Sequence, residues 1–363
     1  MKLNRRKNIY YWKSDRPYVD GNVQNLDPSN REDLEKVLRE YLIDHFKKDL
    51  ADLRPAGGQG NHITYLAIYP GQTYFIRVEN GPEKDDYMDV ESTVLRKVNA
   101  IGIPSPKVYH SDNSRSKVPF AIQVIEYVES KDLNELDKIG ELRTVDIARS
   151  IGGYVAQWQS ITTVKFGLFD PSVLAERGTL EGYHEVYSDY FLLNWDKHLD
   201  YLGEALFLGE KQVAEIKEVV NYYHYLLNIP QGCLVHKDLA LWNILGGPTR
   251  IHAFIDWSDA ISGDDMDDLS LLGCFHSGPV VMAAFDGYAS VKPLPEHYEN
   301  KFWLHLLRNI IFKAVIRVKG NYFDKPDSFF MKKGGSKDLR TVTLERIRSA
   351  CDGLKGNKRI EDL

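Results

Sequence analysis

Apolar positions in the first third of the chain follow a helical period and then a strand period. Residues 29–53 carry apolar side chains at helical spacing after a Ser-Asn pair, which is a common helix start. Residues 62–69 and 73–78 alternate apolar with polar side chains on either side of a Gly-Gln turn, which predicts two paired strands. A helix over 87–100 and a strand over 120–125 follow. The first 125 residues therefore predict a small antiparallel sheet with packed helices.

Long helical patterns dominate the chain from residue 126 onward. They cover 142–161, 186–208, 211–227 and 298–319, and a short segment rich in strand-forming residues, 233–257, interrupts them. This contrast predicts an α+β protein with a small β-rich N-lobe and a larger, mostly helical C-lobe. We expect an irregular leader at 1–28, the N-lobe at 29–125, a hinge at 126–130 and the C-lobe at 131–363.

The composition is that of an ordinary globular protein, and it narrows the function classes. Of 363 residues, 43% are hydrophobic, and 46 basic against 52 acidic residues give a net charge of −6. We therefore do not expect a nucleic-acid binder driven by bulk positive charge. No apolar run is long enough to cross a membrane, and the N-terminus lacks the pattern of a signal peptide. Three widely spaced cysteines suit neither a disulfide framework nor a zinc site, so we expect a cytoplasmic protein.

One segment, from Cys233 to Trp257, combines three polar side chains in an informative order. Asp238 follows His236 by two residues, and Asn243 follows Asp238 by five. A Gly-Gly-Pro turn then predicts a hairpin whose second strand ends at Asp256. Phosphoryl transfer from ATP needs one carboxylate at the acceptor hydroxyl, and an amide oxygen and a second carboxylate for Mg²⁺. Asp238 suits the first role, and Asn243 and Asp256 suit the second.

These motifs resemble the aminoglycoside phosphotransferase and choline kinase superfamily, whose members share a protein-kinase-like two-lobe fold. The resemblance covers residues 34–324 and is most specific over the catalytic segment. It implies a kinase that uses ATP (with GTP not excluded) and Mg²⁺ to phosphorylate a hydroxyl of a small molecule. Four short segments look closest to the hygromycin B phosphotransferase branch: Tyr74–Val78, Phe166–Phe169, Ile255–Ala260 and Val318–Phe323.

The resemblance also assigns nucleotide contacts in the first lobe. A glycine-rich loop before residue 62 would cover the triphosphate, and Arg77 would contact phosphate with Glu91 as its partner. Most kinase-like proteins have Lys at the position of Arg77, but the hygromycin branch carries Arg, a wider, forked cation. The hinge would meet the purine through backbone groups near Glu126 and Val128. The loop residues implied are Gly58, Gly60 and Asn61.

Further acidic residues follow Asp256, the carboxylate expected to bind the metal. By resemblance, His236 and Asp268 support the catalytic loop, and Asp264 belongs to the same bracing segment. Asp259 and Asp265 are candidates to face a cationic acceptor, and a solvated acidic turn is the alternative.

The acceptor is open at this stage. An aminoglycoside or aminocyclitol leads by resemblance, with a metabolic amino alcohol, sugar or hydroxy amino acid as the alternative. A non-catalytic nucleotide-binding protein of the same fold is a third hypothesis, although all three catalytic side chains are present. Protein kinase activity is disfavoured because the metal carboxylate sits in Ile-Asp-Trp and no Ala-Pro-Glu follows. Monomer and homodimer are both compatible with the sequence.

Overall fold

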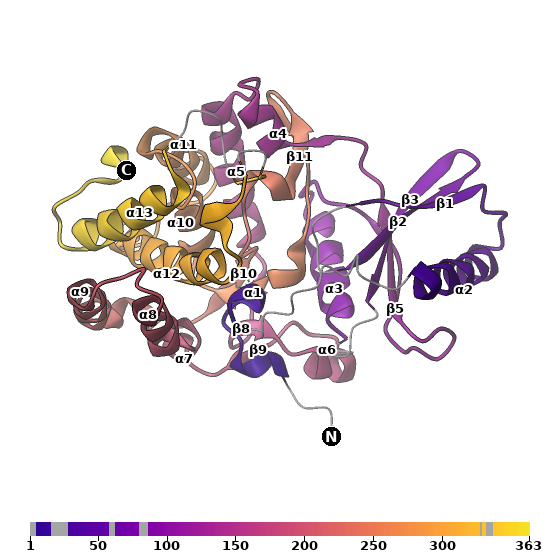
Figure 1. Cartoon of the computed structure of the whole chain (residues 1–363), viewed down its shortest axis with the longest axis horizontal. Helices are drawn as coiled ribbons and strands as arrows, with labels where there is room; N and C mark the ends of the chain where they lie inside the picture. The colour runs from indigo at the N-terminus through magenta and orange to yellow at the C-terminus, as the bar shows by residue number, and fades with distance from the viewer. Residues whose placement is uncertain (1–4, 16–27, 58–61, 80–85, 327–328, 332–336) are drawn as a thin grey trace. The chain divides into compact units, whose positions relative to one another are not determined.

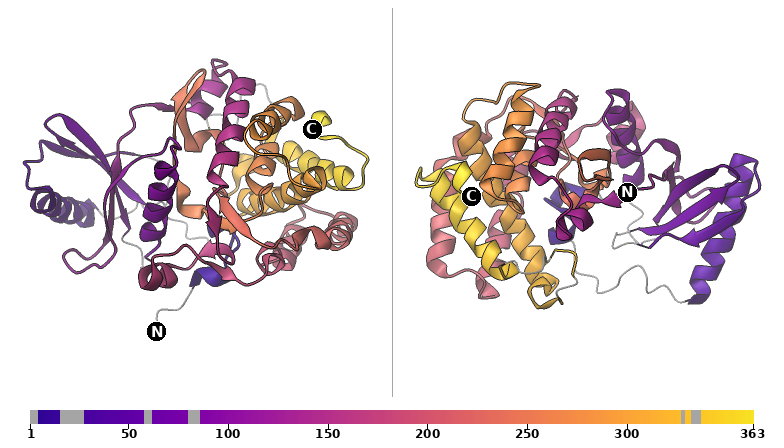
Figure 2. Two further views of the ribbon diagram at one scale, coloured as in Figure 1. Left: turned by 180° about the vertical axis from the view of Figure 1, so that it is seen from behind. Right: turned by 90° about the horizontal axis from the view of Figure 1, so that it is seen from above.

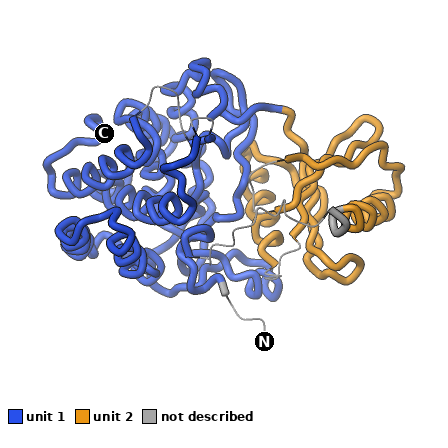
Figure 3. Tube along the Cα trace, viewed as in Figure 1, with its two compact units in different colours: residues 1–18, 130–363 blue, residues 19–129 orange. Residues whose placement is uncertain are grey.

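The chain forms two compact units. The structure is a computed structural model that describes all residues except 1–4, 16–27, 58–61, 80–85, 327–328 and 332–336. The smaller unit is Val19–Glu129, and the larger unit combines Met1–Tyr18 with Ser130–Leu363 (Figure 3). No helix among the described residues is both long enough and apolar enough to cross a membrane.

The smaller unit is built on a five-stranded antiparallel sheet in the order β1-β2-β3-β5-β4 (Figure 1). Its strands match the predicted alternating segments, with the added edge strands β1 and β4. Two helices, α2 and α3, complete the unit. The bounds are α2 Pro28–Phe46, β1 Asp52–Pro55, β2 Ile63–Tyr69, β3 Gln72–Glu79, α3 Tyr87–Ala100, β4 Val108–Asp112 and β5 Ala121–Glu126.

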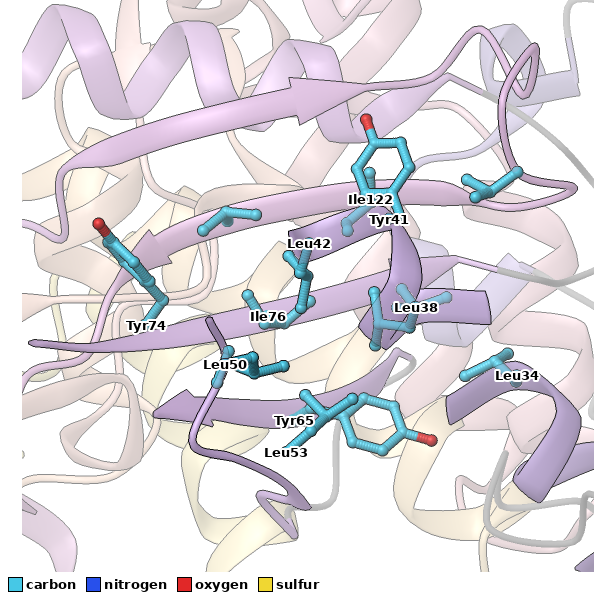
Figure 4. Packing of buried hydrophobic residues seen from close by; sticks show 14 of the residues in the cluster. Leu34, Leu38, Tyr41, Leu42, Leu50, Leu53, Tyr65, Tyr74, Ile76 and Ile122 are labelled. Carbon is cyan, nitrogen blue, oxygen red and sulfur yellow. The ribbon is translucent and has the colours of Figure 1, made fainter. Parts of the chain in front are cut away.

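Helices α2 and α3 cover opposite faces of this sheet. Leu38 and Leu42 of α2 pack with Ile76 of β3 in one buried cluster (Figure 4). Arg77, the next residue, points to the other face because side chains alternate along a strand. It forms a salt bridge there with Glu91 of α3. Each fully buried leucine contributes about 1.5–3 kcal/mol through its apolar surface.

The predicted helix over 29–53 ends earlier than the apolar spacing indicated. Helix α2 stops at Phe46, Lys47 adopts a left-handed φ of 52°, and residues 52–55 form β1. Leu50 and Leu53 still join the same buried cluster. The apolar side chains are therefore buried as their spacing indicated, but those after residue 46 lie in a loop and a strand and not in the helix.

The larger unit is mostly helical and contains two small sheets (Figures 1 and 2). One sheet has the order β7-β10-β13-β8-β9 and the other β12-β11-β6. The helices are α1 Trp12–Asp15, α4 Leu133–Lys138, α5 Thr144–Trp158, α6 Pro171–Arg177, α7 Tyr187–Phe191, α8 Trp195–Glu204, α9 Glu210–Tyr222, α10 Asp267–Gly273, α11 Gly278–Ala289, α12 Tyr298–Lys319 and α13 Leu339–Leu354. The strands are β6 Lys131–Asp132, β7 Thr162–Thr163, β8 Phe166–Phe169, β9 Gly182–His184, β10 Gly232–Val235, β11 Ile244–Gly247, β12 Arg250–Phe254 and β13 Ile261–Gly263.

Three expectations for this unit need correction. The helix predicted over 211–227 is α9, which ends at Tyr222, followed by a 3-10 helix over His224–Leu227. The helix predicted over 186–208 is two helices, α7 and α8, because Asn194 takes a left-handed φ of 58° between them. The leader was expected to be irregular, but Arg5–Asn8 form a 3-10 helix and Trp12–Asp15 form α1. In contrast, α12 has the predicted bounds.

Candidate active site

The backbone that carries the predicted catalytic motif is held by one buried carboxylate. Asp268, at the start of α10, accepts hydrogen bonds from the backbone N–H groups of His236 (2.9 Å) and Lys237 (3.0 Å). It also accepts one from Trp158 Nε1 at 3.1 Å. Lys237 has a left-handed φ of 69°, a conformation that needs such support. Burial raises the pKa of Asp268 to about 7, while the three donors favour its ionised form.

The His236 ring joins this segment to the end of the β11–β12 hairpin. Its Nδ1 accepts the backbone N–H of Asp238 at 3.3 Å, so the proton lies on Nε2, which donates to the carbonyl of Ile255 at 3.0 Å. The ring centroid is 4.4 Å from that of Trp257. Burial lowers the pKa of His236, which fits a neutral, structural ring.

The Asp238 carboxylate is fixed at both oxygens. Oδ2 accepts a hydrogen bond from Asn243 Nδ2 at 2.9 Å, and Oδ1 accepts one from Lys313 Nζ at 3.2 Å. Burial raises the pKa of Asp238, but the charges of Lys313, Lys13 and His236 and the hydrogen bond from Lys313 together outweigh burial and leave that pKa below its usual value. Asp238 is therefore an ionised, oriented acceptor of a proton or hydrogen bond.

Asn243 and Asp256 flank the same end of the hairpin. Ile244 of β11 pairs with Phe254 of β12, and the N–H of Ile255 donates to the carbonyl of Asn243 at 3.0 Å. The Asn243 amide nitrogen donates to the carbonyl of Asp238 at 2.8 Å, which assigns its oxygen as a remaining acceptor. Asp256 has a left-handed φ of 60° and accepts a bond from Ser258 Oγ at 2.9 Å. The hairpin thus presents one amide oxygen and one carboxylate together.

This donor set fits Mg²⁺ that is shared with phosphates. Mg²⁺ prefers hard oxygen ligands and commonly takes one or two carboxylates, with phosphate and water in the remaining positions. Within the described part of the chain, no group of three or more His, Cys, Asp or Glu side chains is placed to hold a metal ion by itself. Asn243 and Asp256 would therefore depend on a phosphate-bearing ligand to complete the site.

Asp259 and Asp265, the two carboxylates predicted to face the acceptor molecule, lie in different surroundings. Asp259 is buried near Asp238 and Asp256, and burial together with these charges raises its pKa to about 7. Asp265 has one oxygen 3.5 Å from Lys301 Nζ, and burial and the neighbouring Asp264 raise its pKa to about 6. The structure thus brings Asp259, but not Asp265, into the cluster around Asp238.

Helix α12 supplies side chains that sequence reasoning missed. His305, Asn309 and Lys313 recur every four residues on one face of α12, and all three are buried. Asn309 accepts a hydrogen bond from Lys237 Nζ at 3.1 Å, and Lys313 contacts Asp238. A polar stripe on a buried helix was the available signal, because buried polar groups need partners.

The structure describes some of the residues of the smaller unit that were predicted to contact the nucleotide. Arg77 and Glu91 are buried and paired. Glu126 ends β5 and accepts the backbone N–H of Lys107 at 3.2 Å, and Val128 is half-buried beyond the strand. The loop residues lie outside the described residues: Gly58, Gly60 and Asn61.

The Arg77–Glu91 pair predicts different outcomes for two substitutions. Arg77→Met should lower the free energy of unfolding by about 3 kcal/mol, because it leaves the buried Glu91 carboxylate without its cation. Arg77→Lys should keep the pair and measurable enzyme activity. Urea unfolding and ADP release would check both variants. Complete loss of activity in a folded Arg77→Lys protein would show that the forked guanidinium itself is required.

Comparison with solved structures identifies similar folds at low sequence identity. Aminoglycoside phosphotransferase APH(4)-Ia has a TM-score of 0.59 at 16% identity, over 88% of this chain and 98% of its own. APH(2″)-IIa, solved with streptomycin and ATP, has a TM-score of 0.54 at 17% identity, over 91% and 99%. A candidate fructosamine-3-kinase from Haemophilus somnus 129PT has a TM-score of 0.57 at 16% identity, over 87% and 97%. These likenesses confirm the predicted α+β, kinase-like fold.

Sequence comparison identifies the family. No curated protein matches the chain. The profile of the phosphotransferase enzyme family, APH, matches residues 52–294, which is more than half of the chain and includes the whole segment from His236 to Asp256. The resemblance seen in the motifs is confirmed, and the chain belongs to the APH phosphotransferase family.

Proposed function

We propose that this phosphotransferase moves the γ-phosphoryl group of ATP to a hydroxyl of a small molecule, with Asp238 as the base. The observation that carries the proposal is the fixed, ionised Asp238 carboxylate beside Asn243, at the end of the hairpin that presents Asp256. These are the residue types that phosphoryl transfer requires.

Each residue of the site has a separate role in the proposed phosphoryl transfer. Asp238 orients the acceptor hydroxyl and takes its proton while the new oxygen–phosphorus bond forms and the bond to the bridging oxygen of ADP breaks. Asn243 and Asp256 would hold Mg²⁺, which neutralises phosphate charge when bound. His236 and Asp268 hold the backbone of the loop in place through the hydrogen bonds described above. Arg77, oriented by Glu91, would contact phosphate, and the backbone near Glu126 and Val128 would contact the purine.

The acceptor we favour is an aminoglycoside or aminocyclitol. A thermostable variant of APH(4)-Ia with this fold was solved with AMP-PNP and hygromycin B, which supports the proposal by likeness of fold alone. The candidate fructosamine-3-kinase supports the alternative, a metabolic sugar or amino-alcohol acceptor. The buried Asp259 near Asp238 favours an acceptor with an amine, because a carboxylate attracts a cation.

An acceptor panel tests this proposal. ADP release from Mg·ATP would be measured with hygromycin B, other aminoglycosides, choline, ethanolamine, hydroxy amino acids and simple sugars. Turnover with aminocyclitols alone supports the favoured acceptor, and turnover with a metabolite alone supports the alternative. A folded protein that binds no nucleotide and turns over no acceptor would contradict the kinase proposal.

The proposed role of Asp256 as an Mg²⁺ ligand predicts an effect on nucleotide binding. Asp256→Ala should remove the Mg²⁺ dependence of nucleotide binding, because the amide oxygen of Asn243 alone is a poor Mg²⁺ ligand. Calorimetric titration with ATP in the presence of Mg²⁺ or EDTA would measure it. Asp200→Ala, at an exposed carboxylate on α8, is the matched control and should keep the metal dependence. An unchanged effect of Mg²⁺ in Asp256→Ala would refute the assignment.

A further inference from the structure

Residues 5–15 are docked on the larger unit by buried contacts around Tyr10. The Tyr10 side chain is buried, and its carbonyl accepts a hydrogen bond from the Tyr190 hydroxyl at 2.8 Å. The Tyr10 and Tyr190 rings stack with their centroids 5.0 Å apart. The Arg308 guanidinium lies 3.4 Å from the centroid of the Tyr10 ring, within the range of a cation–π contact. Residues of α7 and α12 therefore set the position of this ring.

A buried carboxylate fixes the backbone that presents Tyr10. Asp15 Oδ2 accepts the backbone N–H groups of Tyr10 at 2.7 Å and of Tyr11 at 3.1 Å. A hydrogen bond of 2.6 Å joins Asp15 Oδ1 to Nε2 of His198 on α8, and both side chains are buried. The backbone at Tyr10 is therefore tied to α8 through Asp15, and the segment cannot shift without breaking these bonds.

The Tyr10 hydroxyl meets the residue that precedes Asp238. It accepts a hydrogen bond from Lys237 Nζ at 2.8 Å. The same ammonium donates to Asp267 Oδ2 at 2.7 Å and to Asn309 Oδ1 at 3.1 Å. An ammonium has three N–H donors, so these three acceptors together satisfy it. Lys237 is only 1% exposed, and loss of one acceptor would leave a buried donor without its partner.

Lys237 also has a backbone conformation that usually belongs to glycine. Its φ of 69° lies in the left-handed region, where a β-carbon costs free energy. The Lys237 backbone N–H is bonded to Asp268 at 3.0 Å, and its ammonium is bonded as described above. The residue is therefore held in this conformation at both its backbone and its side-chain end. Because Asp238 follows directly, the Lys237 backbone sets the direction of the Asp238 carboxylate.

The neighbouring Tyr11 lies against the second lysine that holds Asp238. Its ring stacks on Phe312 of α12 with centroids 4.4 Å apart, and Lys313 Nζ lies 5.7 Å from the ring centroid. The same Lys313 ammonium is bonded to Asp238 Oδ1. Consecutive residues of the docked segment thus lie against both lysines around this carboxylate.

We propose that Tyr10 is a positioning residue for Asp238 and acts through the Lys237 ammonium. The inference rests on the proposed function, in which Asp238 takes the acceptor proton. The Tyr10 hydroxyl holds the end of the Lys237 side chain, and that side chain helps to hold the backbone that orients the carboxylate. Orientation matters for this step because a misplacement of about 1 Å can lower a rate about 10²-fold.

Tyr10→Phe tests this role because it removes the hydroxyl and keeps the ring beside Arg308. Tyr288→Phe is the matched control, since the Tyr288 hydroxyl is also buried and bonded, at 2.8 Å to Gln159. Amide hydrogen exchange over residues 236–243 would be followed by mass spectrometry. ADP release from Mg·ATP would be measured with water and with each compound of the acceptor panel, and urea unfolding would measure the stability of each variant.

Tyr10→Phe should lower kcat about tenfold and leave KM for Mg·ATP unchanged, because one hydrogen bond to a charged group is lost and the nucleotide is not touched. Amide exchange over 236–243 should become faster in this variant. Tyr288→Phe should lose similar stability but keep kcat and the exchange over 236–243. In a Lys237→Met background, Tyr10→Phe should lower kcat no further, because the hydroxyl has already lost its donor.

The remaining outcomes separate this inference from the proposed function. Unchanged kcat in Tyr10→Phe, or an equal loss of kcat in Tyr288→Phe, would overturn the positioning role while the kinase proposal stands. A further loss of kcat in a folded Lys237→Met protein would also overturn it, because Tyr10 would then act by another route. If Lys237→Met does not fold, the comparison of Tyr10→Phe with Tyr288→Phe decides alone. A wild type that binds no nucleotide and releases no ADP would overturn the proposed function, and this inference with it.

Discussion

Asp238→Asn should reduce kcat for phosphoryl transfer by about 10²- to 10⁴-fold and leave nucleotide binding nearly unchanged. Asparagine keeps the size of the side chain, but its amide does not take the acceptor proton. The effect should appear in kcat because the proton transfer belongs to the transition state. The buried Lys313 ammonium loses its carboxylate partner in this variant, so urea unfolding must be measured alongside.

The control for this variant is Asp286→Asn, at an exposed carboxylate of the same unit that pairs with Arg149 on the surface. Such a pair contributes about 0–1 kcal/mol, so both activity and stability should stay close to those of the wild type. A folded Asp238→Asn protein with wild-type turnover would overturn the assignment of the base.

Asp268→Ala should lower the free energy of unfolding by about 3 kcal/mol or more. The substitution removes the acceptor of three donors, the backbone N–H groups of His236 and Lys237 and the indole N–H of Trp158, all of which are buried. Each buried donor left without a partner costs about 1–3 kcal/mol. Because two of these donors set the backbone on either side of the turn into Asp238, turnover should fall as well.

Urea unfolding would measure this loss, with Asp286→Ala as the exposed control. Asp268→Asn should fall between the wild type and Asp268→Ala, because one carbonyl oxygen remains to accept a hydrogen bond. A folded Asp268→Ala protein with unchanged stability would show that water or a neighbouring side chain replaces the carboxylate.

The sequence was most informative where the interacting residues are close along the chain. The spacing of His236, Asp238 and Asn243 and the hairpin before Asp256 are local features, and their periodicity and turn residues are readable without a tertiary structure. Helix α12 was predicted with the right bounds for the same reason.

Contacts between distant residues were not predictable in this way. Lys313 meets Asp238 across 75 positions, and Lys237 meets Tyr10 across 227. The sequence contains the run Tyr10-Tyr11-Trp12, but no local pattern says which unit it will cover. Only packing of the whole chain brings residues 5–15 against the segment that carries Asp238.

Ion pairs in the structure reduce the negative charge that the sequence suggested for the site. The run of acidic residues after Asp256 suggested a cation-binding surface, yet Asp264 and Asp267 are already paired with Lys301 and Lys237. The case for a cationic acceptor therefore rests on Asp259, whose pKa of about 7 makes its charge depend on pH near neutrality. A count of carboxylates along a sequence does not reveal which of them are neutralised.

The central claim is that this phosphotransferase forms a phosphate ester on an acceptor hydroxyl with Asp238 as the base. The most direct test is ³¹P NMR of the product made from Mg·ATP and the acceptor found in the panel, by the wild type and by Asp238→Asn. The account predicts an oxygen-linked phosphate on the acceptor, formed by the wild type and nearly absent with Asp238→Asn. Inorganic phosphate without a modified acceptor, or equal product from both proteins, would contradict it.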